Sequence, residues 1–248
     1  MTRKVDISLL ITFHREGVLA HSTLNSIERC RTMAEAAGHS CEYVFVFDSA
    51  DQETLEVVGA HGASRHKVTA LSVNNRDLGL SRNDGIAAAE GTYVAILDGD
   101  DYYSGNWIER AAHYAGEYGA KSVLHPEFVV TFGAHAAYCW QVEQRGQYFD
   151  AAGLLMNNFW TSWTFAARQL YLDNPYHRSD VVQTGFGYED WHWNCDTVAR
   201  GIEHRLAWGT VGFYRRKPAS LVQSQVAAGA IIAPTELFSI GTVKRLAS

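Results

Sequence analysis

Several motifs that define large enzyme classes are missing from this chain of 248 residues. Its four cysteines form no C-x-x-C pair, which argues against a zinc framework and against a disulfide scaffold. Without a G-x-G-x-x-G or a Walker lysine motif, neither a dinucleotide oxidoreductase nor a P-loop enzyme is supported. The 11 histidines include no H-E-x-x-H pattern and no other ligand-spaced pair on an expected helix.

Long apolar runs and an excess of positive charge are missing as well. The longest stretch without Asp, Glu, Lys or Arg covers residues 218–235, and its Gln, Ser, Thr and Pro residues argue against a membrane span. With 21 Lys+Arg against 27 Asp+Glu, the net charge is −6, which argues against nucleic acid as a partner because its binding requires a basic face. The short apolar segment after the N-terminus predicts a strand, not a signal peptide.

The residues that are present, 47% hydrophobic and 19% charged, are typical of a folded globular protein. Apolar strands are expected at 7–12, 43–47, 68–73 and 93–97, and helices at 18–37, 52–60, 80–89 and 107–118. Strands that are apolar on both faces need helices on both sides of their sheet. We therefore predict an α/β fold with one Rossmann-like domain, in which helices cover both faces of a mostly parallel central sheet and ligands bind at the carboxyl ends of the strands.

The second half of the chain is less regular and contains six of the seven tryptophans. Its pattern predicts a helix at 190–200 and a last strand at 213–215. Segment 218–234 has small residues and weak periodicity, so we expect a mobile loop there, followed by a terminal helix at 235–246. No change in composition marks a second domain.

Three carboxylates stand directly after the strand at 93–97: Asp98, Asp100 and Asp101. Like charges so close together are tolerated when they are solvated or when a cation joins them. Carboxylate oxygens suit Mg²⁺ or Mn²⁺, which in proteins often also binds substrate phosphates. The segment therefore indicates either a metal–diphosphate site or an acidic turn that caps the next helix.

Charged residues also stand near the other strand ends. Asp48 follows the strand at 43–47, where its carboxylate could accept hydrogen bonds from a base or a ribose, or could cap the helix at 52–60. Arg82 lies where the helix at 80–89 begins, so that it adds to the positive potential of a helix N-terminus. The alternative for Arg82 is a solvated surface position.

Glu189 and Asp190 stand among the glycines and aromatic residues of segment 185–191. An acid that is partly screened from water has a disfavoured charged form, and this suits a general base. The alternative is that Asp190 only caps the helix that follows it.

Over about residues 5–220, these motifs together resemble the inverting family 2 glycosyltransferases, which have the A-type nucleotide-sugar fold. Segment 7–16 resembles the family's opening strand and turn, and segment 79–93 resembles the region around its nucleotide-contacting arginine. Phe47-Asp48 is similar to the family's Asp-Asp pair, with Phe47 in place of the first acid.

Three further motifs carry the same resemblance. Asp98-Gly99-Asp100 is similar to the family's Asp-x-Asp metal motif, and Glu189-Asp190 to its Glu-Asp motif, whose Asp is the catalytic base. Segment 213–220 resembles the late Tyr-x-Arg segment, in which Arg216 and Lys217 stand where a histidine is often found.

The resemblance implies a nucleotide-diphospho-sugar transferase domain at 1–220. Its nucleotide-binding half would cover about 1–101 and its acceptor half about 102–220, with a flexible loop and a C-terminal helix at 221–248. The donor would be a nucleotide sugar, UDP-linked, that gives up a hexosyl or N-acetylhexosaminyl group. The residues expected to contact the nucleotide are Thr12, Phe13, His14, Glu16, Asp48, Arg82, Asp98 and Gly99.

The implied reaction is a direct displacement at the anomeric carbon, with inversion of configuration. Asp190, beside Glu189, would remove the proton of the acceptor hydroxyl. Mn²⁺ or Mg²⁺, held by Asp100 with Asp98 or Asp101, would neutralise the leaving diphosphate. The residues expected to contact that diphosphate directly are Arg216 and Lys217.

The acceptor is expected to be a glycan or a lipid-linked glycan. The aromatic residues that could stack on its sugar rings are Trp160, Trp163, Tyr188 and Trp191. Core packing explains such residues equally well, because large aromatic side chains dominate cores as readily as sites.

Two other functions stay open at this point. A sugar nucleotidyltransferase shares the sheet and the acids, but normally has a Gly-rich basic loop after its first strand, which segment 12–17 lacks. A non-catalytic or degenerate carbohydrate- or sugar-nucleotide-binding protein fits the tryptophans, but a carbohydrate-binding module has no need of the acids. By association, the family suggests polysaccharide biosynthesis for the cell envelope, by a cytoplasmic protein with at most peripheral association at the inner face of the membrane.

Overall fold

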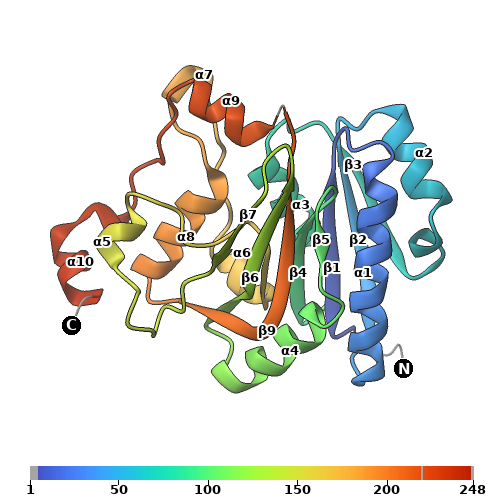
Figure 1. Cartoon of the computed structure of the whole chain (residues 1–248), viewed down its shortest axis with the longest axis horizontal. Helices are drawn as coiled ribbons and strands as arrows, with labels where there is room; N and C mark the ends of the chain where they lie inside the picture. Colours follow the sequence, from blue (N-terminus) through green and yellow to red (C-terminus); the bar gives the residue numbers. More distant parts are fainter. Residues whose placement is uncertain (1–4, 219, 247–248) are drawn as a thin grey trace.

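The computed structural model describes residues 5–218 and 220–246, which contain a nine-stranded sheet of order β3-β2-β1-β4-β8-β6-β9-β5, with β7 paired to β6 (Figure 1). Its first part consists of parallel strands, β1 (Ile7–Phe13), β2 (Cys41–Asp48), β3 (Val68–Val73) and β4 (Tyr93–Asp98). Every residue of β1 is buried, as the continuous apolar pattern predicts for a central strand. These four strands confirm the predicted parallel sheet.

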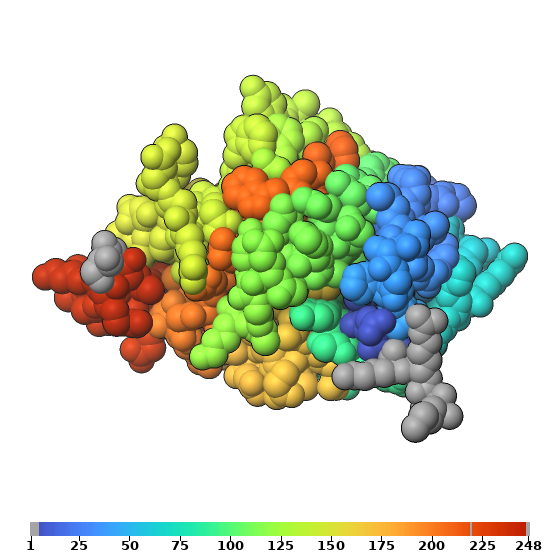
Figure 2. Space-filling model, turned by 90° about the horizontal axis from the view of Figure 1, so that it is seen from below, coloured from blue at the N-terminus to red at the C-terminus, as the bar shows by residue number. Residues whose placement is uncertain are grey.

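Helices cover both faces of this sheet. One core contains residues of α1 (Leu19–Ala36), α2 (Gln52–Ala60) and α4 (Trp107–Tyr118), and the other contains residues of α3 (Leu78–Ala88), α6 (Arg168–Asp173) and α8 (Glu189–Ala199). Figure 2 shows α4 (green) and α1 (blue) side by side on the face seen from below, with the C-terminal segment (red) at the opposite end from α1. The predicted layers are therefore confirmed.

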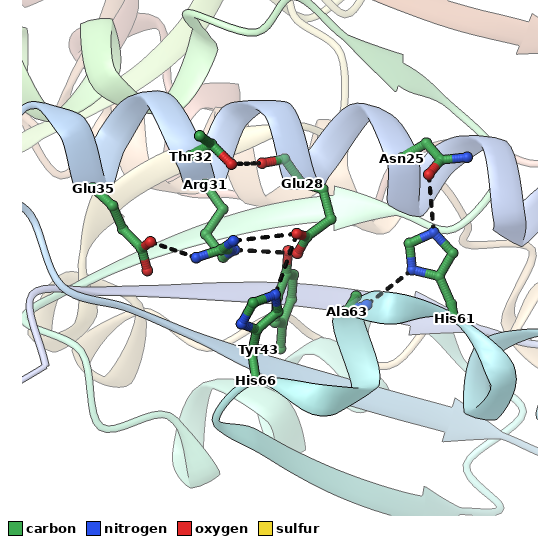
Figure 3. A network of polar contacts seen from close by, with 9 residues as sticks. All are labelled: Asn25, Glu28, Arg31, Thr32, Glu35, Tyr43, His61, Ala63 and His66. Atoms are coloured by element: carbon green, nitrogen blue, oxygen red, sulfur yellow. Dashed lines mark hydrogen bonds and ion pairs between the residues drawn. The ribbon is translucent and has the colours of Figure 1, made fainter.

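Polar contacts fix α1 to the strands beneath it (Figure 3). Glu28 accepts hydrogen bonds from Arg31 on the same helix and from the Tyr43 hydroxyl on β2. His66, which follows η1 (Gly62–Arg65), lies 3.3 Å from the Glu28 carboxylate. The helix therefore has a fixed position over the strands that lead to the carboxyl edge of the sheet.

The second half of the chain adds five strands: β5 (Tyr102–Tyr103), β6 (Ser122–Gly133), β7 (Ala137–Trp140), β8 (Thr164–Ala167) and β9 (Glu203–Arg216). The predicted last strand at 213–215 is part of β9, but it was predicted too short, and β6 was missed. Strands β6 and β9 are long and pair in parallel from Ser122↔Glu203 to Gly133↔Arg216. Polar residues interrupt the apolar pattern of β6 and β9, so the sequence does not predict their full length. They belong to the sheet because β6 pairs with both β8 and β9.

Strands β6 and β9 extend beyond the carboxyl edge of the parallel part. Through β8, Leu124 on β6 lies level with Ala95 on β4, and β6 continues to Gly133 whereas β4 ends at Asp98. The extended β6–β9 pair therefore forms a wall beside the turn that follows β4 (Figure 1).

The C-terminal segment differs from the predicted loop and helix. Within 218–234 the structure has helix α9 (Leu221–Ala227), which begins where the Ser220 hydroxyl accepts a hydrogen bond from the Gln223 N–H. The predicted helix at 235–246 is divided into η2 (Glu236–Phe238) and α10 (Ile240–Leu246). Leu237 packs into a third core with α8 and α5 (Ala151–Leu154).

One further short helix is α7 (Val181–Thr184). Among the described residues, no helix has the length and apolar character needed to cross a bilayer.

Two buried histidines join β6 to β9. His125 Nε2 lies 2.9 Å from His204 Nδ1, and His204 Nε2 lies 2.9 Å from the Thr197 hydroxyl. The ring of Trp160 stacks on His204 with 4.4 Å between centroids. Burial lowers the pKa of His204 to about 3, and burial together with the neighbouring His204 lowers the pKa of His125 well below its usual value.

These histidines predict an acid-sensitive stability. Below about pH 6.5 the unfolded chain binds protons at both positions and the folded chain does not, so acidification to about pH 5.5 removes about 1 kcal/mol of unfolding free energy per histidine. Urea denaturation at about pH 7.5 and about pH 5.5 measures the loss, which should be smaller in His204→Gln. The exposed His113 provides the control, since His113→Gln should keep the wild-type dependence. Equal dependence in His204→Gln and wild type would contradict this assignment.

Candidate active site

The predicted polar residues meet at the carboxyl ends of β1, β2 and β4. Thr12 on β1 pairs with Asp98 on β4, so the turn after β4 begins directly beside the end of β1. A side chain at Gly99 would lie 2.7 Å from the Phe13 ring and 2.8 Å from the Thr12 carbonyl oxygen. Only glycine fits there, and this close contact fixes the acidic turn against β1.

Arg82 connects the two acidic motifs. Its Nη2 donates to Asp98 Oδ1 at 2.9 Å and its Nη1 donates to Glu189 Oε1 at 3.1 Å, although these acids are far apart in the sequence. The Arg82 side chain is fully buried, and its guanidinium lies 5.6 Å from the centre of the Tyr176 ring. The turn after β4 and the start of α8 therefore belong to one site.

One of the two sequence interpretations of Arg82 was wrong. Arg82 is not a solvated surface residue, because its side chain is fully buried. Its guanidinium donates to Asp98 and Glu189 and thereby positions both acids. Its contact with the nucleotide stays a prediction.

Glu189 and Asp190 lie in the first turn of α8. Tyr188 precedes them in the left-handed region with φ 57°, which is the sharp turn that starts the helix there. The alternative role of Asp190 as the residue that caps the helix is wrong, because Tyr188 occupies that position. The helix N-terminus favours the negative charge of both acids.

The surroundings of Glu189 and Asp190 raise the pKa of both acids. Burial raises the pKa of Asp190, and the opposing attraction of Arg82 does not cancel this effect. Burial and the charge of Asp190 raise the pKa of Glu189 to about 7, despite its contact with Arg82. One oxygen of Asp190, Oδ2, accepts a hydrogen bond from Asn158 Nδ2 at 3.1 Å.

The Asp48 carboxylate accepts three hydrogen bonds from the loop before α3 and from α3 itself. Its Oδ1 accepts from the Arg76 N–H at 3.0 Å, and its Oδ2 accepts from the Asp77 N–H at 3.2 Å and the Ser81 hydroxyl at 2.9 Å. The Ser49 hydroxyl, which has one hydrogen, donates it to Asn74 Oδ1 at 2.6 Å. Asp48 therefore holds the loop before α3, and its contact with the nucleotide stays a prediction.

The end of β1 presents few of its predicted contact side chains. Phe13 is buried and stacks on Phe47 at 5.5 Å between ring centroids, so its side chain lies in the core rather than in a nucleotide site. Thr12 is buried as well. His14 is exposed, its Nδ1 lies 2.6 Å from the Asp48 carbonyl oxygen, and its N–H donates to Glu16 at 2.6 Å. His14 and Glu16 thus remain at the edge of the site.

The acids after β4 do not fit the expected site for Mn²⁺ or Mg²⁺. Asp98 uses its oxygens for Arg82 and for the Ser162 hydroxyl at 2.6 Å. Asp101 accepts from the Arg215 N–H at 2.6 Å and from Trp163 Nε1 at 3.1 Å, and it is buried. Asp101 is therefore a structural residue, which corrects its assignment as a metal ligand.

Asp100 is the remaining acid of that turn, and its Oδ2 lies 2.6 Å from Lys217 Nζ. Within residues 5–218 and 220–246, no group of three or more His, Cys, Asp or Glu side chains could hold a metal ion. Asp100, which is itself paired with Lys217, is therefore the one acid of this turn left for a metal ion, where the sequence analysis expected two.

Two of the four predicted acceptor residues are in the core. Trp160 and Trp163 are 3% and 0% exposed, and their indole N–H groups donate to the Val142 carbonyl oxygen and to Asp101. No sugar ring can stack on either, so core packing was the right alternative for them. Tyr188 and Trp191 are half-buried beside Asp190 and stay candidates for the acceptor side.

Two residues of the site were missed by the sequence analysis. Asn158 contacts Asp190 and also accepts a hydrogen bond from Asn194 at 2.9 Å, while Ser162 contacts Asp98. The only signal was a group of polar residues between aromatic ones in segment 157–163, which carries no spacing rule.

Solved structures of TarS from S. aureus share this fold. TarS 1-349 in complex with UDP-GlcNAc has a TM-score of 0.64 and 15% sequence identity, with 89% of this chain and 61% of that chain covered. The same fragment in complex with UDP has a TM-score of 0.61 and 16% identity, with 86% and 61% covered. The chain described here therefore shares the fold of TarS.

Residues 8–156, more than half of the chain, match the model of the family described as Glycosyl transferase family 2. The protein belongs to this family. Relatives include the Succinoglycan biosynthesis protein ExoO of Rhizobium meliloti (strain 1021), 34% identical over 105 residues, and the Putative glycosyltransferase EpsH of Bacillus subtilis (strain 168), 25% identical over 111 residues. These matches cover 42% and 45% of this chain but only 30% of each relative.

Arg82 should be essential for the stability of the site. Arg82→Met leaves Asp98 and Glu189 without their buried cation, so we expect the free energy of unfolding to fall by about 3 kcal/mol or more. Urea denaturation measures this loss. Arg145→Ala is the matched control, because it removes a largely exposed ion pair with Glu203 and should cost less than about 1 kcal/mol. Similar losses in both variants would contradict the role assigned to Arg82.

Proposed function

We propose that this protein transfers a sugar from a UDP-linked donor to a hydroxyl group of a glycan or lipid-linked acceptor, with inversion at the anomeric carbon. The observation that supports the proposal is the Arg82 bridge between Glu189 and Asp98. Asp190, the proposed base, adjoins Glu189, and Asp98 begins the turn beside which the leaving diphosphate would lie. The complexes of TarS with UDP and UDP-GlcNAc support the choice of donor, and the name of ExoO supports polysaccharide biosynthesis.

Asp190 has the properties of a general base. Its pKa is raised by burial, so its carboxylate is a stronger base than an exposed aspartate. Asn158 holds its Oδ2, which fixes the orientation of the carboxylate. In the reaction Asp190 takes the proton of the acceptor hydroxyl while that oxygen attacks the anomeric carbon.

The leaving group lies on the other side of the same site. The electron pair of the broken bond passes to the diphosphate, whose growing charge needs positive groups. Arg216 and Lys217 stand at the end of β9, and Lys217 contacts Asp100 in the turn after β4. This position supports their predicted contact with the diphosphate.

The acceptor side is expected to include Tyr188 and Trp191. Both are half-buried, they meet edge to face at 5.7 Å between centroids, and they flank Asp190 in the sequence. An aromatic face beside the base can hold a sugar ring with its hydroxyl toward Asp190.

Asp190→Asn should abolish transfer and leave donor binding intact. The amide keeps the shape of the side chain but cannot take a proton, so we expect kcat to fall by about 10²-fold or more. Release of UDP from a UDP-sugar in the presence of acceptor measures the rate, and calorimetry with UDP measures binding. Asp196→Asn, on the same helix, should keep the wild-type rate. Full turnover by Asp190→Asn would remove Asp190 from this role.

The rate should also depend on pH in the acid range. Only deprotonated Asp190 accepts the proton, so kcat/KM should fall as the pH drops through its raised pKa, above the ordinary value of about 3.9. The test measures kcat/KM as a function of pH. The pH dependence of UDP binding, measured separately, is subtracted from this profile. An acid limb at the ordinary aspartate value would show that burial does not tune the base.

A further inference from the structure

Lys217 occupies the position beside Asp100 that the sequence assigned to a divalent ion. Its ammonium lies 2.6 Å from Asp100 Oδ2, and 34% of its side chain remains exposed. The carboxylate of Glu16 adds negative charge near the same ammonium. The lysine is therefore anchored by an acid of the turn while part of it faces solvent.

The end of β9 gives Lys217 this position. The Arg215 N–H donates to Asp101 Oδ1 at 2.6 Å, and Arg215 Nε donates to the Asp100 carbonyl oxygen at 2.9 Å. Asp100 and Asp101 thus hold Arg215, the residue directly before Arg216 and Lys217. Arg216, by contrast, is exposed, with its guanidinium 5.2 Å from the centre of the Tyr214 ring.

A divalent ion and this lysine would compete for one carboxylate. Mg²⁺ in proteins is usually held by one or two carboxylates together with substrate phosphates. Of the three acids after β4, only Asp100 is not held by Arg82, Ser162, Trp163 or the backbone of Arg215. A metal ion bound there would displace Lys217 and then lie next to its positive charge, which costs free energy.

We propose that Lys217 itself supplies the fixed positive charge for the leaving diphosphate, in place of a divalent metal ion. This inference rests on the proposed transfer reaction. The bond between the anomeric carbon and the diphosphate oxygen breaks, and its electron pair stays on that oxygen. The acceptor oxygen forms the new bond and its proton goes to Asp190. The Lys217 ammonium donates hydrogen bonds to the diphosphate and keeps its own protons, while Asp100 holds it in place.

The experiment compares UDP binding and sugar transfer in excess EDTA and with added Mn²⁺. The variants are Lys217→Ala, which removes the charge, and Lys217→His, which removes it and offers Asp100 a neighbouring metal ligand instead. Lys121→Ala serves as the matched control, because Lys121 is an exposed lysine directly before β6, at the opposite edge of the sheet. Thermal unfolding confirms that each variant is folded.

In EDTA we expect wild type and Lys121→Ala to bind UDP equally well and to transfer sugar, with less than about a threefold change when Mn²⁺ is added. Lys217→Ala should bind UDP at least about tenfold more weakly in both conditions, since it loses a charged hydrogen bond. Lys217→His should be equally weak in EDTA but regain binding with Mn²⁺.

The opposite pattern would overturn the inference. If wild type binds UDP or transfers sugar only with Mn²⁺, and Lys217→Ala keeps both, then a metal ion and not Lys217 carries the charge, while the transferase function stands. If wild type binds no UDP under either condition, the proposed donor is wrong and the inference fails with it.

Discussion

A single guanidinium, fully buried between two carboxylates, holds the end of β4 against the start of α8. Burial of Arg82 removes a positive charge from water, which is costly unless acids surround it at hydrogen-bonding distance. Asp98 and Glu189 meet that requirement, and each is in turn kept in place by the arginine. The geometry of the site depends on this contact because its two acidic motifs come from distant parts of the chain.

The acids after β4 avoid mutual repulsion by having separate partners. Asp98 faces Arg82, Asp100 faces Lys217, and Asp101 lies buried against Trp163 and the backbone of β9. In the sequence these three acids form one cluster that indicates a metal site. In the fold, each of them lies in a different environment. The long β6–β9 pair makes these separate contacts possible, because it brings the C-terminal end of β9 to the turn that follows β4.

The family assignment favours one of the functions that the sequence left open. A nucleotidyltransferase or a carbohydrate-binding module would fit parts of the pattern, but the chain belongs to a glycosyltransferase family. Of the tryptophans that suggested carbohydrate binding, Trp160 and Trp163 lie in the core. The matched region covers only 30% of the length of each of these relatives.

The sequence by itself determined the parallel half of the sheet and the positions of Asp98, Glu189 and Asp190 in their motifs. Buried strands such as β1 are continuous apolar runs, and their ends are readable without knowledge of the rest of the chain. Only the tertiary structure decided the partners: Asp98 and Glu189 for the buried Arg82, Ser81 for Asp48, and Asp100 for Lys217. These contacts join residues far apart in the chain, and strand pairing such as that of β6 with β9 sets them, so no local pattern of residue types could show them.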